Sequence, residues 1–302
     1  MNAQPPVAGP EQAAAADAGV PGSGSSRSWL RFWKAFARQP TAVIGFFIVL
    51  GAVLVAILAP YLAPYGAREL VDQALASPTA DHPLGSDVIG RDVLSQVIYG
   101  TRVALLFGIG VAGITLVLGV VLGAVPAYFG GWVDDVFSRI FELFLTIPRL
   151  VLTIVLVALF GGGIISVAIV VGLTFWPTNA KIVRSQVLSI KQRGFVRAAR
   201  ACGAGHLRIL ARHIIPNGLY PVVTNTVMQM GFAIIFEAAL SFLGLGDPNF
   251  PSWGQLLFEG NLRRAAWWLS VFPGIAITIL VLGFNLVGDG VNRAANPRTR
   301  QR

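Results

Sequence analysis

The side chains that could do chemistry concentrate in one polar stretch, residues 191–216, which we call the basic segment. It carries six arginine or lysine side chains and no acid, and no Asp or Glu occurs anywhere over residues 143–236. Cationic segments between apolar runs of membrane-spanning length are typical of the cytoplasmic face of a membrane protein. The chemistry that this composition indicates is electrostatic docking of a soluble partner.

The spacing within the basic segment predicts a short helix at its start. Arg193, Arg197 and Arg200 recur at i, i+4 and i+7 and form one exposed stripe. The other positions hold mostly small apolar residues: Phe195, Val196, Ala198, Ala199 and Cys202. Small side chains permit close approach by another surface, so we expect this helix to contact a partner.

A bend and a second short helix complete the basic segment. Gly203 allows the positive φ with which many helices end. Residues 206–213 then repeat the arginine spacing with Arg208 and Arg212. Pro216 suits the first turn of the following helix, where its missing N–H group is not needed.

An ordinary cationic loop that only fixes membrane orientation is the alternative interpretation of the basic segment. Lys181 and Arg184 lie just before it and bring the number of basic residues to eight. That number exceeds what orientation requires, so we favour docking of a partner.

Two ionisable residues interrupt the apolar runs, and each has two interpretations. Arg149 is costly in a membrane unless it faces a cavity or a partner. It could meet the carboxylate of a solute, or it could extend to the membrane interface or pair with Glu142. Glu237 could bind a solute amine, but the small residues after it favour a structural role in which it caps a neighbouring helix.

Catalytic and metal-binding patterns are weak in this sequence. His82, Asp87 and Asp92 offer metal-ligand side chains, but their spacing matches no metal motif and the Pro and Gly residues around them predict turns. No Ser/His/Asp or Cys/His set lies where three groups could converge. The chain also lacks a Gly-Lys pair and therefore a Walker A loop. We expect a chain without catalytic residues, metal or bound cofactor.

Composition places much of the chain in a membrane. Of its 302 residues, 55% are hydrophobic and 12% are charged, whereas a soluble domain has about 25% charged residues. The net charge of +9 would suggest nucleic acid as a partner of a soluble protein. Here the basic residues lie beside apolar runs, so we expect a lipid bilayer and no nucleic acid. The single Cys202 excludes a disulfide within the chain.

The apolar runs predict an all-α membrane protein with six transmembrane helices. Their expected positions are residues 42–59, 103–129, 136–160, 164–180, 219–245 and 269–287. Gly119 and Gly123 form a small-xxx-small pair in the second span, which lets another helix approach closely. Pro148 distorts the third span.

Three basic clusters place both termini in the cytoplasm, on the side of the basic segment. The chain is expected to begin with a disordered tail and an interfacial amphipathic helix with one cationic and one aromatic face. The remaining parts are the first span, an acidic extracytoplasmic segment, a core of five spans that contains the short cytoplasmic helices, and a basic tail. Their limits are residues 1–26, 27–40, 42–59, 60–102, 103–290 (short helices 191–213) and 291–302.

The bend lies in a pattern that resembles the cytoplasmic coupling motif of ABC-importer permeases, written Glu-Ala-Ala, three residues, Gly, nine residues, Ile-x-Leu-Pro. Residues 197–199 (Arg-Ala-Ala) occupy the first triplet, with Arg197 where the family commonly has Glu, and Gly203 follows at the motif's spacing. Residues 212–217 (Arg-His-Ile-Ile-Pro-Asn) are close to the form found in the dipeptide/oligopeptide branch. The resemblance implies contact with an ATPase for Arg193, Phe195, Val196, Arg197, Ala198, Ala199, Arg200, Gly203, Arg208 and Pro216.

Further segments extend the resemblance, in order, over about residues 30–295. They resemble the outer segment, the end of the fifth span with its following loop, and the closing segment of dipeptide, oligopeptide and nickel permeases. Their positions here are residues 82–87, 90–95, 98–100, 237–246, 251–254 and 284–290. The chain is similar to the C-type permease subunit of that group.

This resemblance implies a type I ABC importer permease in a prokaryotic cell membrane. Its expected partners are a homologous permease, two cytoplasmic ATPase subunits that bind ATP and Mg²⁺, and an extracytoplasmic substrate-binding protein. Di- or oligopeptides are the expected solutes, with nickel, glutathione or another small solute as alternatives. A different class remains open, namely a membrane scaffold whose basic segment recruits a soluble factor without transport.

Overall fold

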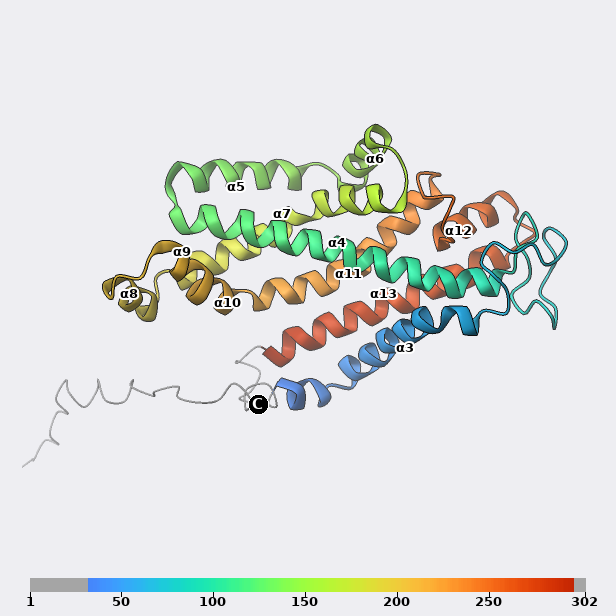
Figure 1. Cartoon of the computed structure of the whole chain (residues 1–302), viewed down its shortest axis with the longest axis horizontal. Helices are drawn as coiled ribbons and strands as arrows, with labels where there is room; N and C mark the ends of the chain where they lie inside the picture. The colour runs from blue at the N-terminus through green and yellow to red at the C-terminus, as the bar shows by residue number, and fades with distance from the viewer. Residues whose placement is uncertain (1–31, 296–302) are drawn as a thin grey trace, which may run out of the picture.

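A bundle of long helices forms the body of the protein, and the computed structural model describes residues 32–295 (Figure 1). Five helices are long and apolar enough to span a membrane: α3 (Pro40–Leu62), α4 (Val93–Phe129), α7 (Ile164–Ile190), α11 (Tyr220–Phe242) and α13 (Trp268–Ala295). The shorter ones are α5 (Gly131–Thr146), α6 (Arg149–Phe160), α8 (Gly194–Ala201), α9 (His206–Ile209), α10 (Ile215–Gly218) and α12 (Trp253–Leu262). Within these described residues there is no β-strand beyond two isolated bridges. The predicted all-α membrane fold is confirmed.

The predicted third span is broken into two helices. α5 ends at Thr146, α6 begins at Arg149, and the two helices are bent by 93° at this break. Ile147 is extended, with φ −77° and ψ 131°, because the ring of Pro148 disfavours the α conformation in the residue before it. The bundle has a sixth crossing only if this bent pair counts as one span. The distortion expected at Pro148 is thus a complete break, and the third span is a bent pair of helices.

Helix α4 begins at Val93, well before the predicted start of the second span at residue 103. The carboxylate of Asp92 accepts hydrogen bonds from the backbone N–H and the hydroxyl of Ser95, both at 2.7 Å. Such a cap satisfies an N–H group that has no partner within the helix. The first turns of α4 are polar, so hydropathy does not detect them.

Close packing between α4 and α7 depends on the two glycines that the sequence singled out. A Cβ atom on Gly119 would lie 2.5 Å from Cβ of Asn179, and one on Gly123 would lie 2.4 Å from the carbonyl oxygen of Ala180. Both distances are too short for any side chain. The predicted small-xxx-small contact is confirmed, and α7 is its partner.

The N-terminal part of the described chain packs against the end of α13. Residues 32–37 are helical, and Phe36 is buried in a cluster with Ala42 and Ala294. Lys34 and Arg38 are exposed. Part of the aromatic face expected to lie in lipid is thus covered by protein. The predicted tail at residues 1–26, residues 27–31 and residues 296–302 lie outside the described range.

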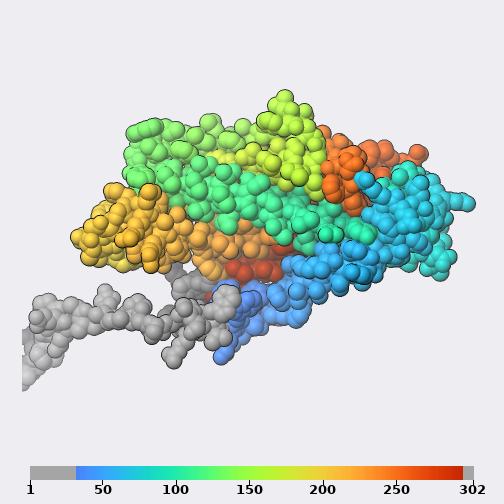
Figure 2. Space-filling model, in the orientation of Figure 1, coloured from blue at the N-terminus to red at the C-terminus, as the bar shows by residue number. Residues whose placement is uncertain are grey.

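The basic segment and the loop before α4 occupy opposite ends of the bundle. Figures 1 and 2 show α8 and α9 at one end of the long axis and residues 63–92, which we call the outer segment, at the other. This separation fits a protein with parts on both membrane faces. Which face is cytoplasmic stays a prediction.

Candidate functional site

The predicted arginine stripe lies on α8 and faces outward. Arg193, Arg197 and Arg200 are exposed, and Phe195 beside them retains 43% of its accessible surface. Val196 differs from the other residues of this helix because it is completely buried. It anchors α8 to the bundle, while the arginines and Phe195 form the outer surface.

The predicted bend follows α8 directly. Gly203 has a φ of +78°, a conformation that glycine adopts without steric cost. The N–H of Gly203 donates to the carbonyl of Arg200 at 3.0 Å, and the N–H of Ala204 donates to that of Ala199 at 3.1 Å. These bonds satisfy carbonyl groups left free at the helix end. The chain therefore turns sharply at Gly203 and starts a second helical segment.

That second segment contains a π-helical stretch, Leu210–Ile214, between α9 and α10. In this second segment Arg208 and Arg212 are exposed, whereas Ile209 and Ile214 are completely buried. Pro216 lies in the first turn of α10, as expected. It has no N–H group to donate to the carbonyl four residues earlier, and the wider turn comes directly before it.

The inner side of the basic segment is fixed to α4 and α7. Val196, Ile209 and Ile214 share one apolar cluster with Ala127 of α4 and Ile190 of α7. Because apolar burial is worth about 25 cal/mol per Å², this cluster holds α8 and α9 to the bundle. The exposed arginines are therefore carried by a well-packed base.

Polar contacts reinforce this attachment, and sequence reasoning missed them. The hydroxyl of Tyr128 in α4 lies 3.0 Å from Nδ1 of His206 in α9. The ammonium group of Lys191 donates to the carbonyl of Ala127 at 2.8 Å. These partners are 78 and 64 residues apart in the chain, so only the packing of α4 beside α7 reveals them.

Arg184 is engaged with Asp134 and is not free for a partner. Its guanidinium donates to both carboxylate oxygens, at 2.7 and 2.8 Å, in the bidentate geometry of strong arginine–carboxylate pairs. This pair ties α5 to α7. It removes Arg184 from the eight basic residues that the sequence offered for docking.

Arg149 begins α6 and reaches across to α7. Its guanidinium donates to the hydroxyl of Thr178 at 2.5 Å and lies 5.0 Å from the centre of the Phe175 ring. Glu142, the partner considered from the sequence, instead accepts a hydrogen bond from Arg139 at 3.0 Å. Arg149 also lines an open groove of about 520 Å³ that Lys181 shares.

Glu237 lies in α11 and is buried among hydroxyl groups. Its carboxylate accepts hydrogen bonds from Ser241 at 2.8 Å and from Ser252 at 2.7 Å. Ser252 in turn caps α12, because its hydroxyl accepts from the N–H of Gly254 at 3.1 Å. The geometry joins α11 to α12 through Glu237.

The acids of the outer segment serve its folding. Asp87 accepts from Nε of Arg91 at 2.5 Å and from the amide of Gln96 at 2.9 Å. His82 lies 3.1 Å from Asp92 through Nδ1. Within residues 32–295, no group of three or more His, Cys, Asp or Glu side chains has the arrangement of a metal site.

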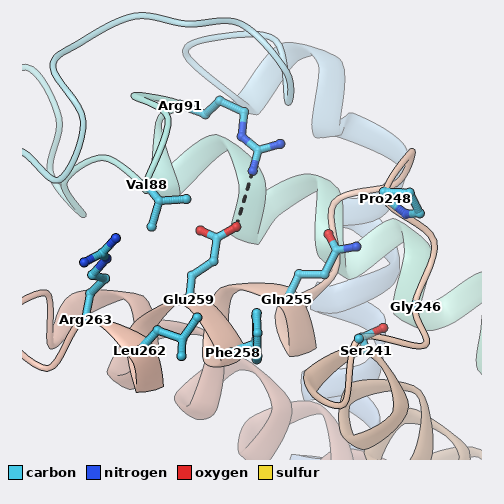
Figure 3. A pocket seen from close by; sticks show the side chains of 11 residues that line it. Val88, Arg91, Ser241, Gly246, Pro248, Gln255, Phe258, Glu259, Leu262 and Arg263 are labelled. Carbon is cyan, nitrogen blue, oxygen red and sulfur yellow. Dashed lines mark ion pairs between the residues drawn. The ribbon is translucent and has the colours of Figure 1, made fainter.

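A cavity of about 580 Å³ opens between the outer segment, the end of α11 and α12 (Figure 3). Glu259 of α12 projects into it and pairs with Arg91 at 3.7 Å. Burial of the carboxyl group, together with the charge of Asp87, raises the pKa of Glu259 to about 7 although Arg91 opposes the shift. The sequence did not single out Glu259, because its raised pKa depends on burial against the outer segment, which is distant in the chain.

Comparison with known families matches most of the chain. Residues 115–301 match the family described as binding-protein-dependent transport system inner membrane component. Residues 28–78 match the N-terminal TM domain of oligopeptide transport permease C.

Two relatives resemble the chain over nearly its full length. The dipeptide transport system permease protein DppC of Alkalihalophilus pseudofirmus is 35% identical over 275 residues, which are 90% of each chain. The glutathione transport system permease protein GsiD of Pectobacterium atrosepticum is 37% identical over 276 residues, 90% of this chain and 92% of that one.

A solved structure supports the fold. A chain of the MetNI methionine ABC transporter, in an inward-facing conformation, superposes with a TM-score of 0.56 at 18% identity, over 67% of this chain and 97% of that chain. This likeness shows the type I importer permease fold. Together with the family match, it confirms the resemblance that the coupling motif suggested. The chain belongs to the binding-protein-dependent transport system inner membrane components, as a multi-pass permease subunit of an ABC importer.

Proposed function

We propose that this permease imports di- and oligopeptides together with a homologous permease. Two separate ATPase subunits bind ATP and Mg²⁺ and hydrolyse the nucleotide, and an extracytoplasmic binding protein delivers the solute. The names of the relatives support this substrate class, because dipeptides and glutathione are both short peptides. Nickel or another small solute is the alternative.

The observation that carries the coupling role is an exposed basic surface on a buried apolar base. Arg193, Arg197 and Arg200 form no ion pair with any acid of the described chain. Phe195 is exposed beside them, and apolar and arginine side chains are typical of protein interfaces. A groove on an ATPase subunit with acidic side chains at its rim would complement this surface.

The attachment of the basic segment gives a route for motion. Closure of the ATPase subunits would move α8 and α9 together, because the bend at Gly203 is closed by backbone hydrogen bonds. The movement would pass to α7 and α11 along the chain and to α4 through Tyr128 and Lys191. Tilting of these helices against the second permease is alternating access by rocking of helix bundles.

The coupling role predicts that Gly203→Pro separates ATP hydrolysis from transport. Proline cannot adopt the φ of +78° found here, so α8 and α9 would lose their fixed angle. We expect the reconstituted complex to keep ATP hydrolysis and lose uptake of labelled dipeptide by roughly tenfold or more, a barrier change of about 1.4 kcal/mol. The measurement is the number of ATP molecules hydrolysed per solute transported.

Gly205→Pro is the matched control, because φ at Gly205 is −66° and already suits proline. It should retain normal coupling. Normal uptake by Gly203→Pro would contradict the rigid coupling of α8 to α9. A purified membrane complex without any ATPase subunit would instead contradict the transport role and favour a scaffold.

Competition uptake tests the substrate class. Cells that lack this chain should lose uptake of a labelled dipeptide and regain it with the wild-type gene. Unlabelled tripeptide and glutathione should compete, whereas nickel should not. Unchanged dipeptide uptake in the deletion strain would remove dipeptides as the main solute.

A further inference from the structure

The groove beside Arg149 lies where α6 begins and α7 passes it. Its polar lining consists of Arg149, Thr178, Lys181, Ser185 and Gln186, and none of the lining residues is acidic. The volume of about 520 Å³ is large enough for a small solute group. Two cations, two hydroxyls and one amide thus face a single open space.

Arg149 is held in a defined orientation in this groove. The Thr178 hydroxyl accepts one of its N–H groups, and the Phe175 ring packs beside the guanidinium. A guanidinium has five N–H donors, so most of them stay available. The Arg149 side chain thus has a fixed direction, while most of its N–H donors have no hydrogen-bond partner within the described residues.

No acid of the described chain neutralises Arg149 or Lys181. Neither residue takes part in any of the ion pairs found over residues 32–295. Two of the three acids of α5 are engaged elsewhere, Asp134 with Arg184 and Glu142 with Arg139. Residues 143–236 contain no Asp or Glu, so no acid that could pair with Arg149 or Lys181 comes from α6 to α10 or from the part of α11 before Glu237.

The break between α5 and α6 adds a further positive element. α6 starts at Arg149 after the extended residues 147–148, and no side chain caps its first N–H groups. Half-helices that begin inside a membrane protein often direct their positive N-terminal ends at anionic solute groups. The charge of Arg149 and the start of α6 therefore act at one place.

We propose that this groove binds an oxyanion, the carboxylate of a transported peptide, between Arg149 and Lys181. The inference rests on the proposed peptide transport and adds the chemical group that the pathway recognises. The phosphate of a lipid headgroup shares the same chemistry, and the experiment below separates the two sources.

Charge-selective labelling of the groove tests the site in the assembled complex. Ser185→Cys is exposed within the groove, and it is made in a Cys202→Ser background because Cys202 is the single native thiol. We expect the sulfonatoethyl methanethiosulfonate reagent to react faster than the trimethylammonioethyl reagent, relative to free cysteine. Arg149→Gln should lower this preference by about tenfold.

Two variants show whether the charge itself is responsible. Arg149→Lys keeps a cation and should keep most of the preference for the anionic reagent. Arg102→Gln removes an exposed arginine of α4 that does not line the groove, and it should change nothing. An equal preference in Arg149→Gln and the parent would overturn the proposal.

Competition during labelling identifies the source of the anion. In phosphatidylcholine vesicles, millimolar dialanine should slow the anionic reagent at least threefold, and dialanine amide should not. Arg149→Gln should abolish this protection. Equal protection by both compounds, or by neither, would overturn the carboxylate site. Protection that requires phosphatidylglycerol would assign the groove to lipid and overturn it as well.

The labelling assay uses no ATP and does not report on the basic segment. A negative labelling result would therefore leave the proposed coupling to the ATPase subunits untouched, because coupling is tested separately by uptake and ATP hydrolysis in Gly203→Pro. A complex that lacks ATPase subunits would contradict the transport role and still leave charge selectivity in the groove measurable.

Discussion

A carboxyl group far from the basic segment occupies a place where its ionisation is unfavourable. Glu259 lies in the outer cavity with one oxygen 3.7 Å from Arg91 and the other buried without a hydrogen-bond partner among the described residues. Burial and the charge of Asp87 raise its pKa to about 7. The folded protein therefore holds this proton up to a higher pH than the unfolded chain does.

Glu259→Gln should make thermal stability less dependent on pH. As pH rises from the carboxyl group's ordinary pKa to about 7, the unfolded chain has released this proton and the folded protein still binds it. The free energy of unfolding of the wild type therefore falls across that window. Glutamine cannot ionise, so we expect the variant to melt a few degrees higher than the wild type at pH 8.

Melting curves of the purified complex between pH 5 and pH 8 measure this effect. The difference between variant and wild type should shrink toward pH 5. Asp81→Asn removes an exposed acid of the same outer segment and serves as the control. Parallel pH profiles for wild type and Glu259→Gln would show that Glu259 does not titrate in this range.

Among the elements, the contact between α4 and α7 sets the geometry of everything at the basic end. α4 supplies Ala127 and Tyr128 to the basic segment, and α7 leads directly into it. Gly123 brings the two backbones together, since a Cβ there would lie 2.4 Å from the carbonyl oxygen of Ala180. The position of the basic segment thus depends on a glycine inside the bundle, where any side chain would separate the two helices.

Gly123→Ala should separate α4 from α7 and destabilise the protein by about 1–3 kcal/mol through overpacking. The expected result is a lower melting temperature and a reduced yield of complex with the ATPase subunits. Gly113→Ala is the matched control, because a Cβ there meets nothing within 4 Å and alanine favours the helix by about 1 kcal/mol. A Gly123→Ala protein as stable as Gly113→Ala would contradict the close contact.

The sequence predicted those features that depend on neighbours along the chain. Apolar runs located the long helices, and the bend at Gly203 and the glycine pair in α4 followed from local rules. The sequence predicted only a distortion at Pro148, because the residues on both sides of this proline are apolar and hydropathy shows no interruption. The backbone nevertheless leaves the helical conformation at residues 147–148. The polar start of α4 was missed, because its helix depends on the cap from Asp92.

Pairings in space were beyond prediction from the sequence. Arg184 with Asp134 and Tyr128 with His206 connect residues 50 and 78 positions apart. Each requires the packing of helices whose order along the chain does not fix their neighbours. Glu142 was a reasonable partner for Arg149 by spacing, but the proline break turns α6 away, and Glu142 pairs with Arg139 on its own helix.

The whole molecule has two chemically different ends. The basic segment lies at one end and the acidic outer segment at the other (Figure 2). Positive charge beside membrane spans favours the cytoplasmic side. We therefore predict an orientation with the cavity of Glu259 outside and the arginine stripe inside.

Labelling with a membrane-impermeant maleimide tests this orientation. In the chain expressed without ATPase subunits, Cys202 is exposed and should react only in inside-out vesicles. A second thiol, made by Asp81→Cys with Cys202→Ser, should react only in right-side-out vesicles. Labelling of both positions from one side would contradict the predicted orientation.

The break at Pro148 has a consequence for how the molecule changes shape. Helical hydrogen bonding stops at Thr146 and resumes at Arg149, so α6 can swing relative to α5 without giving up the ladder of either helix. The contacts of Arg149 with Thr178 and Phe175 oppose that swing. Val157 of α6 is also buried against α7, so a ligand that draws Arg149 away from Thr178 would remove one of several contacts that fix the angle of α6, and binding in the groove would then depend on that angle.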